Sequence, residues 1–272
     1  GDTQGPFRVL SSEGSKLNIK FIDYSTRYAK IFGVSDGSAE TALSVFKPFI
    51  TRLERRTGDK CKYFRCDDGN EFKGVFFDYL ENLGIQKQRG LPYAHHIPPQ
   101  CENLHKNIMS RGRSVHVASN LPLEYYLDAQ NYAVYKWNRE FHSGLDKTPF
   151  ELIYGKRPNV ANYVPFGCIG YAYLRQEIRD KPENFGKLNN VSVKCRMLGY
   201  GNDDDSEEVA GYKILVDANP PYVTYSDNVK WDLHAKMTLL DGACVLSESD
   251  LDDLYGDVNI ATDDEFIPEI IE

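Results

Sequence analysis

A cluster of carboxylates is the first place where this sequence offers chemistry. The stretch RCDDGNEF places Asp67, Asp68 and Glu71 around one glycine, directly after an apolar run typical of a short strand. Carboxylates this close repel one another and raise each other's pKa unless a cation or solvent separates them. The stretch is therefore either an ordinary polar turn or a place where a positive ion binds.

Two acids elsewhere in the chain could join this cluster. Asp2 lies before the first strand-like segment, and Glu102 falls in the first turn of a helix that proline allows to begin near residue 99. Mg²⁺ prefers carboxylate oxygens. Two such ions about 4 Å apart can activate a nucleophile and stabilise the leaving oxygen of a phosphoryl transfer. Folding that gathers Asp2, Asp67 and Glu102 at one end of a sheet would form such a site.

Each acid also fits a purely structural interpretation. A DDG sequence is commonly a turn, and a glutamate in a first helical turn commonly complements the helix dipole. An acid close to a chain end commonly faces solvent. The residue types alone leave both interpretations open.

Strand-like and helix-like segments alternate along the first half of the chain. Residues 16–23 and 27–34 alternate apolar and polar side chains across a short turn, which predicts a β-hairpin. Ser38 is a suitable N-cap for the helix expected next. The other predicted elements are strands at 62–66 and 85–89 and helices around 72–83, from about 99, and over about 123–138. This order predicts a hairpin-first α/β domain and a helical connector.

The pattern changes after Pro165. Five short segments rich in aromatic and β-branched residues follow, separated by polar, glycine or proline breaks. This spacing predicts a small all-β module of Src-homology-3-like size. We therefore expect an α/β domain at 1–118, a helical connector at 119–164, a β module at 165–232 and an acidic tail at 233–272.

Composition and charge limit the class of protein. The 272 residues are 41% hydrophobic and 26% charged, and no apolar run is long enough to span a membrane. The six cysteines are scattered without a CxxC pair, which argues against a zinc ribbon or a disulfide framework. The tail holds eleven acids and one lysine, so the overall charge of −8 leaves about +2 on the body. We expect a mobile tail or linker, and a body compatible with a polyanionic partner. The first residue is Gly rather than Met, so we expect a piece of a longer protein.

Motifs along residues 1–232 resemble those of one family in the family's own order. They are DTQGP, FIDYSTRY, RCDDGNEF, LGIQKQRGLPYAHHIPPQCEN, AVYKWNREFHSGLDKTPFELIYGKRPNVANYVPFGCIGYAY, CRMLGYG and YSDNVKWD. Each is a weak signal alone, but together they are strong. The body resembles the integrase region of a copia-type long-terminal-repeat retrotransposon polyprotein.

The resemblance implies a fold, an activity and a set of site residues. The fold is α/β, with a ribonuclease-H-like mixed sheet and flanking helices, followed by a small all-β barrel-like module. The catalytic and metal-binding triad falls on Asp2, Asp67 and Glu102, since Asp68 stands where the family has Asn. Two Mg²⁺ (or Mn²⁺) ions are expected there. The implied activity is that of a polynucleotidyl transferase with endonuclease activity, which nicks the element's DNA end and joins it to target DNA.

Partners and location follow from the same resemblance. The expected partners are the DNA ends of the element and the target DNA. The chain is expected to form a homo-oligomer and not to bind a membrane. Lys106 lies four helical positions beyond Glu102 and keeps the positive charge expected at a DNA phosphate. Arg111 and Arg113 could line a DNA groove or form a solvated face. Family members act in the nucleus after a cytoplasmic virus-like particle stage.

Departures from the family's pattern keep other functions open. Pro98 and Pro99 stand where the family has Asn-Gly, and Asn103 replaces its Arg. These changes favour a catalytically decayed or domesticated copy that acts as a DNA- or protein-binding module, whereas the complete triad opposes it. A ribonuclease-H-type nuclease is a third possibility, opposed by the β module and the TPFELIYGKRP segment. No cysteine has ligand spacing to the histidines at 95, 96 and 105, so these are interpreted as surface residues rather than zinc ligands.

Overall fold

The computed structural model describes residues 1–66, 69–89, 99–161, 163–173, 191–201 and 211–235, together with residues 249 and 251. Of residues 89 and 99–105 the backbone is described but the side chains are not. No helix among these residues is long and apolar enough to cross a bilayer.

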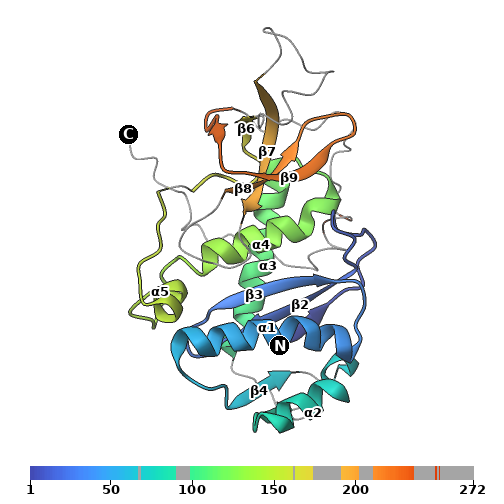
Figure 1. Cartoon of the computed structure of the whole chain (residues 1–272), viewed down its shortest axis with the longest axis vertical. Coiled ribbons are helices and arrows are strands. Elements are labelled where there is room, and N and C mark those ends of the chain that lie inside the picture. The colour runs from blue at the N-terminus through green and yellow to red at the C-terminus, as the bar shows by residue number, and fades with distance from the viewer. Residues whose placement is uncertain are drawn as a thin grey trace.

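A mixed sheet forms the centre of the first domain (Figure 1). Strands β1 (Asp2–Gln4), β2 (Leu17–Ile22) and β3 (Ala29–Val34) are antiparallel in the order β1-β2-β3. Strands β4 (Tyr63–Cys66) and β5 (Gln86–Arg89) form a parallel pair. The two parts are adjacent, because the amino nitrogen of Gly1 donates a hydrogen bond of 2.7 Å to the carbonyl oxygen of Arg65. This mixed sheet confirms the predicted hairpin and α/β class.

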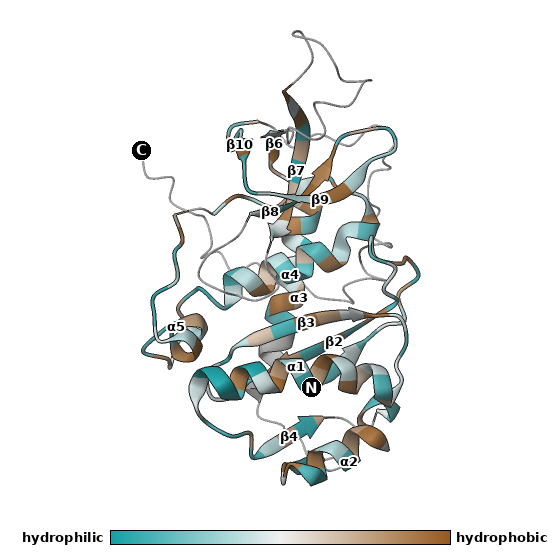
Figure 2. Ribbon diagram, viewed as in Figure 1, coloured by the Kyte–Doolittle hydropathy of each residue, from teal (hydrophilic) through white to brown (hydrophobic). Residues whose placement is uncertain are grey.

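Helices cover both faces of this sheet. The helices are α1 (Ala39–Thr57), α2 (Val75–Asn82), α3 (Pro99–Ser119), α4 (Tyr126–Trp137) and α5 (Pro149–Tyr154), with short 3₁₀ helices η1 (Asn70–Phe72) and η2 (Leu123–Tyr125). The N-cap of α1 is Ser38, whose side chain accepts a hydrogen bond from the Thr41 backbone N–H as its residue type predicts. Figure 2 shows hydrophobic and hydrophilic residues alternating along α1, as an amphipathic helix on a sheet requires.

Alternation along β2 and β3 divides the core into two clusters. Ile19 and Phe21 face α1 and α2, where Phe46 and Phe76 meet them. Ala29 and Ile31 belong to the cluster on the other face, which α3 and α4 supply with Ile108, Met109, Leu127, Val134 and Trp137. Helices on both faces make this a ribonuclease-H-like layered arrangement, as the sequence resemblance implied.

The second sheet is antiparallel and open in the described residues. Its strands are β6 (Ile169–Tyr173), β7 (Ser192–Tyr200), β8 (Tyr212–Val216), β9 (Tyr222–Ser226) and β10 (Val229–Trp231), in the order β10-β6-β7-β8-β9. All five predicted segments form strands, but no described pairing closes β9 onto β10 into a barrel. The sheet packs on α4 through Tyr132, Phe166, Leu198 and Leu215.

One residue of the predicted acidic tail lies in the core. Leu251 is buried in the same cluster as Ala29 and Ile31. The expectation of a mobile tail therefore does not hold at this residue, because its side chain contributes to the packing between the sheet and the helices. The predicted domain boundaries at residues 118, 164 and 232 stay predictions.

Candidate active site

Asp2 lies on a strand of the central sheet. Strand β1 pairs with β2 so that Asp2 stands opposite Lys20, and the side chain of Asp2 is half-buried. The sequence indicated only that Asp2 precedes the first strand-like segment. Three polar residues carry too little pattern to predict a strand, and β1 forms because β2 provides a neighbour for its backbone groups.

The end of β4 lies beside the start of β1. The hydrogen bond between Gly1 and the Arg65 carbonyl joins the residue before Asp2 to the residue before Cys66. Cys66 is buried and ends β4, and Asp67 follows it directly in the sequence. Asp67 itself lies outside the described residues, and so does Asp68. The backbone therefore brings the start of β1, which carries Asp2, next to the end of β4, which precedes Asp67 in the sequence.

Lys20 is a buried lysine at this site that sequence reasoning missed. Its Nζ donates to Gln4 Oε1 at 2.6 Å and to Met109 Sδ at 2.9 Å, and its side chain is 4% exposed. Burial lowers the pKa of Lys20 to about 7, although the charge of nearby Asp2 acts in the opposite direction. The alternation of β2 indicated a solvent-facing side chain, but α3 covers this face as well.

Helix α3 crosses the same face and carries Glu102. Glu102 is helical, but its side chain lies outside the described residues. Met109, which contacts Lys20, lies seven residues later, so position 102 shares its helical face about 10 Å toward the N-terminus of α3. The backbone of α3 thus connects Glu102 to Met109, whose side chain contacts Lys20, the residue paired with Asp2.

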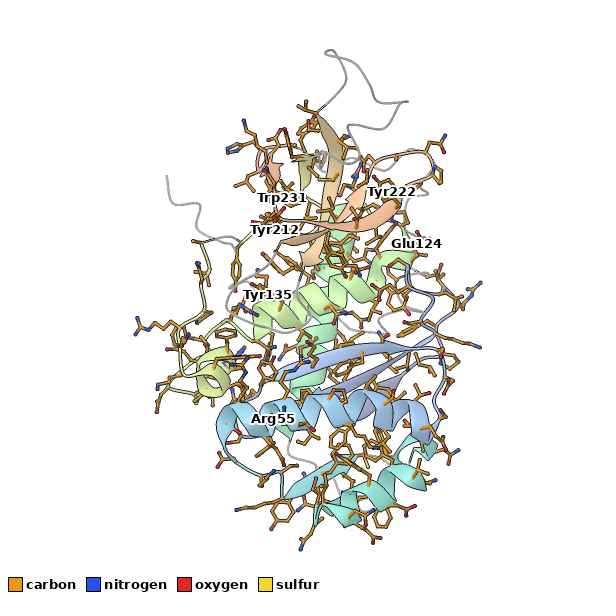
Figure 3. The ribbon with its side chains drawn as sticks, viewed as in Figure 1. Arg55, Glu124, Tyr135, Tyr212, Tyr222 and Trp231 are labelled. Carbon is orange, nitrogen blue, oxygen red and sulfur yellow. The ribbon has the colours of Figure 1, made fainter. Side chains whose placement is uncertain are left out.

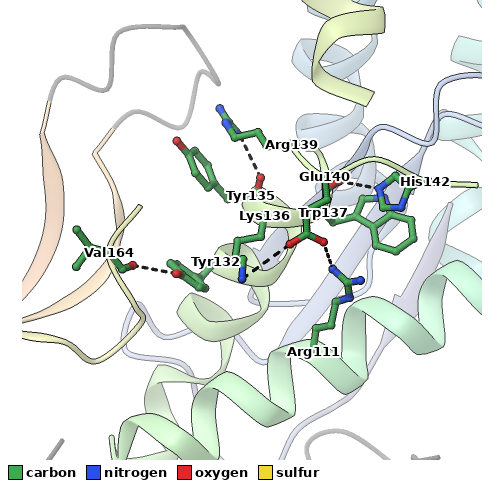
Figure 4. Close-up of polar contacts among 9 residues, drawn as sticks. All are labelled: Arg111, Tyr132, Tyr135, Lys136, Trp137, Arg139, Glu140, His142 and Val164. Carbon is green, nitrogen blue, oxygen red and sulfur yellow. Dashed lines mark hydrogen bonds and ion pairs between the residues drawn. The ribbon is translucent and has the colours of Figure 1, made fainter. Parts of the chain in front are cut away.

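The predicted DNA-contacting residues differ in their surroundings. Lys106 is exposed on α3, and Arg113 is half-buried on the same helix. Arg111 forms an ion pair with Glu140 and lies over the ring of Trp137, with 5.3 Å between its Cζ and the ring centroid (Figure 4). Arg111 thus links α3 to the end of α4. The DNA-binding roles of all three residues stay predictions.

The structure describes only some of the residues that were predicted to bind a metal ion. Among the described residues, no group of three or more His, Cys, Asp or Glu side chains could hold a metal ion. Asp67 and the side chains of Glu102 and His105 are outside that set, as are His95 and His96. The half-buried carboxylate of Asp2 is a hard oxygen ligand of the kind that Mg²⁺ takes. Asp2 therefore fits one position of the expected metal site.

The chain is similar in sequence to retrovirus-related Pol polyproteins. It is 27% identical over 205 residues to the polyprotein of transposon TNT 1-94 from Nicotiana tabacum. It is 29% identical over 195 residues to that of RE2, and 28% over 193 residues to that of RE1, both from Arabidopsis thaliana. Over these residues the chain is similar to the Pol polyproteins of retrotransposons. This confirms the copia-type resemblance drawn from the motifs.

The similarity covers most of this chain but only a small part of the polyproteins that it matches. The alignments span 75%, 71% and 71% of the chain and 15%, 13% and 13% of the TNT 1-94, RE2 and RE1 polyproteins. No family model matches the chain. The chain therefore spans only a small part of the length of the curated relatives that it matches.

Two solved structures of retroviral integrases resemble the fold weakly. The catalytic core domain of BIV integrase matches 56% of this chain and 91% of that chain, with a TM-score of 0.42 and 15% identity. A simian T-cell lymphotropic virus intasome in complex with PP2A regulatory subunit B56 gamma matches 85% of this chain and 77% of that chain, with a TM-score of 0.43 and 15% identity. The fold assignment therefore rests on the strand order and helix placement described above.

Proposed function

We propose that this chain is the catalytic and β-module part of a retrotransposon integrase. Its reaction would be metal-dependent phosphoryl transfer on DNA, namely end processing followed by strand transfer. The observation that carries the proposal is the position of Asp2 on a central strand, next to the end of β4 and on the face crossed by α3. In this proposal, the three acids from separate parts of the sequence would lie close together beside the inner strands β1 and β4.

Each acid has a distinct structural support in this proposal. Asp2 is carried by β1, Asp67 follows β4 in the sequence, and Glu102 is in the first turn of α3. Together they would hold two Mg²⁺ or Mn²⁺ ions, which when bound supply charge neutralisation and an activated oxygen nucleophile. Lys20 would fix the spacing of these acids, because its hydrogen bonds join β1 to α3. Such chemistry depends mainly on positioning and electrostatics, so rigid supports matter.

DNA would bind along the exposed side of α3. Lys106 is exposed four positions after Glu102, so it lies on the same side of the helix as that acid. A lysine there positions the phosphate backbone without reading sequence. We further propose that the chain acts as a homo-oligomer on two DNA ends, in the nucleus after a virus-like particle stage.

The direct test is a strand-transfer assay on a DNA duplex that carries the terminal-repeat ends of the encoding element. With Mg²⁺ or Mn²⁺, the chain should nick the ends and join them to a target duplex. Asp67→Asn and Glu102→Gln should each reduce both steps at least 100-fold, because removal of one electrostatic element of a phosphoryl-transfer site costs about that much. Asp68→Asn is the matched control and should retain activity.

A second candidate function is supported by a specific set of departures. Pro98, Pro99 and Asn103 alter the segment around Glu102. These features favour a binding module that has lost its chemistry. Salt-dependent DNA binding without cleavage, unchanged by Asp67→Asn, would support it over the integrase. Cleavage confined to RNA–DNA hybrids would instead support a ribonuclease-H-type nuclease.

A further inference from the structure

The outer side of α1 carries a row of cations and hydroxyls. Lys47, Thr51 and Arg55 are exposed and follow one another at intervals of four residues, so they form a straight row about 12 Å long on the helix surface. Arg56 is exposed beside Arg55, which Figure 3 labels on this helix. An open hollow of about 720 Å³ follows the row, and no acid lines it.

Two of these cations lie over aromatic rings instead of acids. Nζ of Lys47 is 4.9 Å from the ring centroid of Tyr79, and Cζ of Arg56 is 5.3 Å from that of Tyr154. Such contacts orient a cation without neutralising its charge. Within the described part of the chain, Lys47, Arg55 and Arg56 form no ion pair with an acid. The row therefore keeps its positive charge.

The acids of α1 lie outside the row. Glu54 is half-buried and accepts hydrogen bonds from Lys60 Nζ at 2.7 Å and from the backbone N–H of Cys61 at 2.9 Å. Glu40 is in the first turn, about 10 Å before Lys47 along the helix axis. The middle and last turns of α1 therefore present a surface that attracts anions.

The composition of the row suits a phosphate backbone rather than a protein. Lys, Arg and Thr side chains are common donors to the phosphates of DNA, and such contacts carry no sequence information. Protein interfaces are instead built around a buried aromatic or aliphatic anchor. The exposed large hydrophobic side chains of the described residues all lie outside α1. A second copy is also unsuitable, because a two-fold contact through this surface would bring like charges together.

The same surface favours a DNA duplex over a single strand or RNA. Single strands bind by stacking bases on aromatic rings, but Tyr79 is covered by Lys47, and Tyr154 is covered by Arg56 and stacks on Phe150 with 4.4 Å between ring centroids. An RNA duplex is recognised by contacts that cross its minor groove, which one straight row does not provide. A DNA duplex needs only its dense row of phosphates.

We propose that the outer side of α1 binds the phosphate backbone of a DNA duplex without reading its sequence. Lys47 and Arg55 contact phosphates at the two ends of the row, and the hydroxyl of Thr51 donates between them. Arg56 adds charge beside Arg55.

This surface is separate from the candidate active site. Helix α1 packs on the core cluster that contains Ile19 and Phe21, whereas α3 packs on the cluster on the other face of the sheet, which contains Ala29 and Ile31. Duplex binding to α1 therefore occurs whether or not the chain catalyses DNA integration.

Fluorescence anisotropy with the full chain tests the binding. The probe is a short DNA duplex of arbitrary sequence, in EDTA so that no metal-dependent reaction contributes. Lys47→Gln/Arg55→Gln should reduce the slope of log binding constant against log salt by about 1.8, which is about 0.9 for each lost phosphate contact. Lys16→Gln/Lys147→Gln removes two exposed cations that do not line the hollow and should leave the slope unchanged. Equal losses in both double variants would overturn the inference, because net charge alone would then explain the binding.

Acetylation of the full chain shows which lysine the duplex covers. Bound duplex should slow acetylation of Lys47 at least about threefold, because an ammonium held by a phosphate must be released before it reacts. Lys16 and Lys147 should react at unchanged rates. An unchanged rate at Lys47 would overturn the inference, and a rate that is already slow without DNA and stays so would assign the row to the acidic tail.

Competitors test the chemistry of the ligand. Polyglutamate that slows acetylation of Lys47 as much as the duplex, at equal total charge, would overturn the inference and assign the row to an acidic protein. Stronger slowing by single-stranded DNA or by an RNA duplex would overturn it as well. None of these measurements uses a divalent ion or terminal-repeat ends, so their failure is distinct from a failure of the proposed integrase function.

Discussion

At the scale of single residues, Lys20 distinguishes this site from an ordinary cluster of acids. A buried ammonium opposite Asp2 is costly, because burial disfavours the charged form. Gln4 and Met109 supply its hydrogen-bond acceptors, and Asp2 supplies a compensating charge. The alternating sequence of β2 indicated a solvated lysine. A single strand's pattern cannot show that helices cover both faces of the sheet.

Lys20 predicts a specific dependence of stability on pH. Its pKa is lowered from 10.5 to about 7 in the folded chain. Between these values the unfolded state binds more protons, so the free energy of unfolding rises with pH, by at most roughly 1.4 kcal/mol per pH unit from this group. Lys20→Met should abolish that contribution in urea unfolding measured from pH 7 to 9.5. The exposed-lysine control Lys16→Met should retain it, and equal slopes in wild type and Lys20→Met would contradict the assignment.

At the scale of elements, α1 is supported by an aromatic cluster on the sheet. The ring of Phe46 is 5.1–5.2 Å from those of Phe21, Phe64 and Phe76, and its side chain is 2% exposed. Phe46→Ala should therefore lower the free energy of unfolding by about 3–5 kcal/mol in chemical denaturation. Phe141, which is 72% exposed, provides the control. Phe141→Ala should cost less than about 0.5 kcal/mol, and a similar loss in both variants would refute this packing account.

The same scale shows what sequence patterns could and could not predict. Periodicity and capping indicated β2, β3 and α1, because each buries a regular stripe of side chains. The helix predicted around 72–83 forms as η1 and α2, and Leu83 at its end is the C-cap of α2 and is 51% exposed. Helix α5 was missed as an element, although Thr148 and Glu151 form a capping box. The fold of β1, and hence the placement of Asp2, depends on contacts between distant segments that no local pattern contains.

At the scale of the whole molecule, a buried ionic group joins the second sheet to α4 and to the segment between β1 and β2. Lys213 of β8 bonds Asp128 of α4 at 2.6 Å and also pairs with Glu13. Burial raises the pKa of Asp128, whereas the positive charge of Lys213 and its hydrogen bond act to lower it. Burial would lower the pKa of Lys213, but Asp128 and Glu13 raise it overall. The β module is thus fixed to the first domain by charge as well as by the packing on α4.

Breaking this group should loosen the whole molecule. Asp128→Asn leaves Lys213 buried with a weaker set of partners and should cost about 3 kcal/mol of unfolding free energy. The double variant Asp128→Leu/Lys213→Met removes both charges and should recover part of that loss. A double-mutant cycle in urea measures the coupling. Additive losses would show that the pair does not hold the second sheet to α4.

Divalent-ion binding tests the central claim most directly, because the claim is that Asp2, Asp67 and Glu102 share one metal site. Mn²⁺ binding to the full chain, followed by electron paramagnetic resonance, should show a saturable site. Asp2→Asn, Asp67→Asn and Glu102→Gln should each weaken it at least tenfold, while Asp68→Asn and the tail variant Asp263→Asn should not. Mn²⁺ affinity that is the same in all five variants would contradict the account.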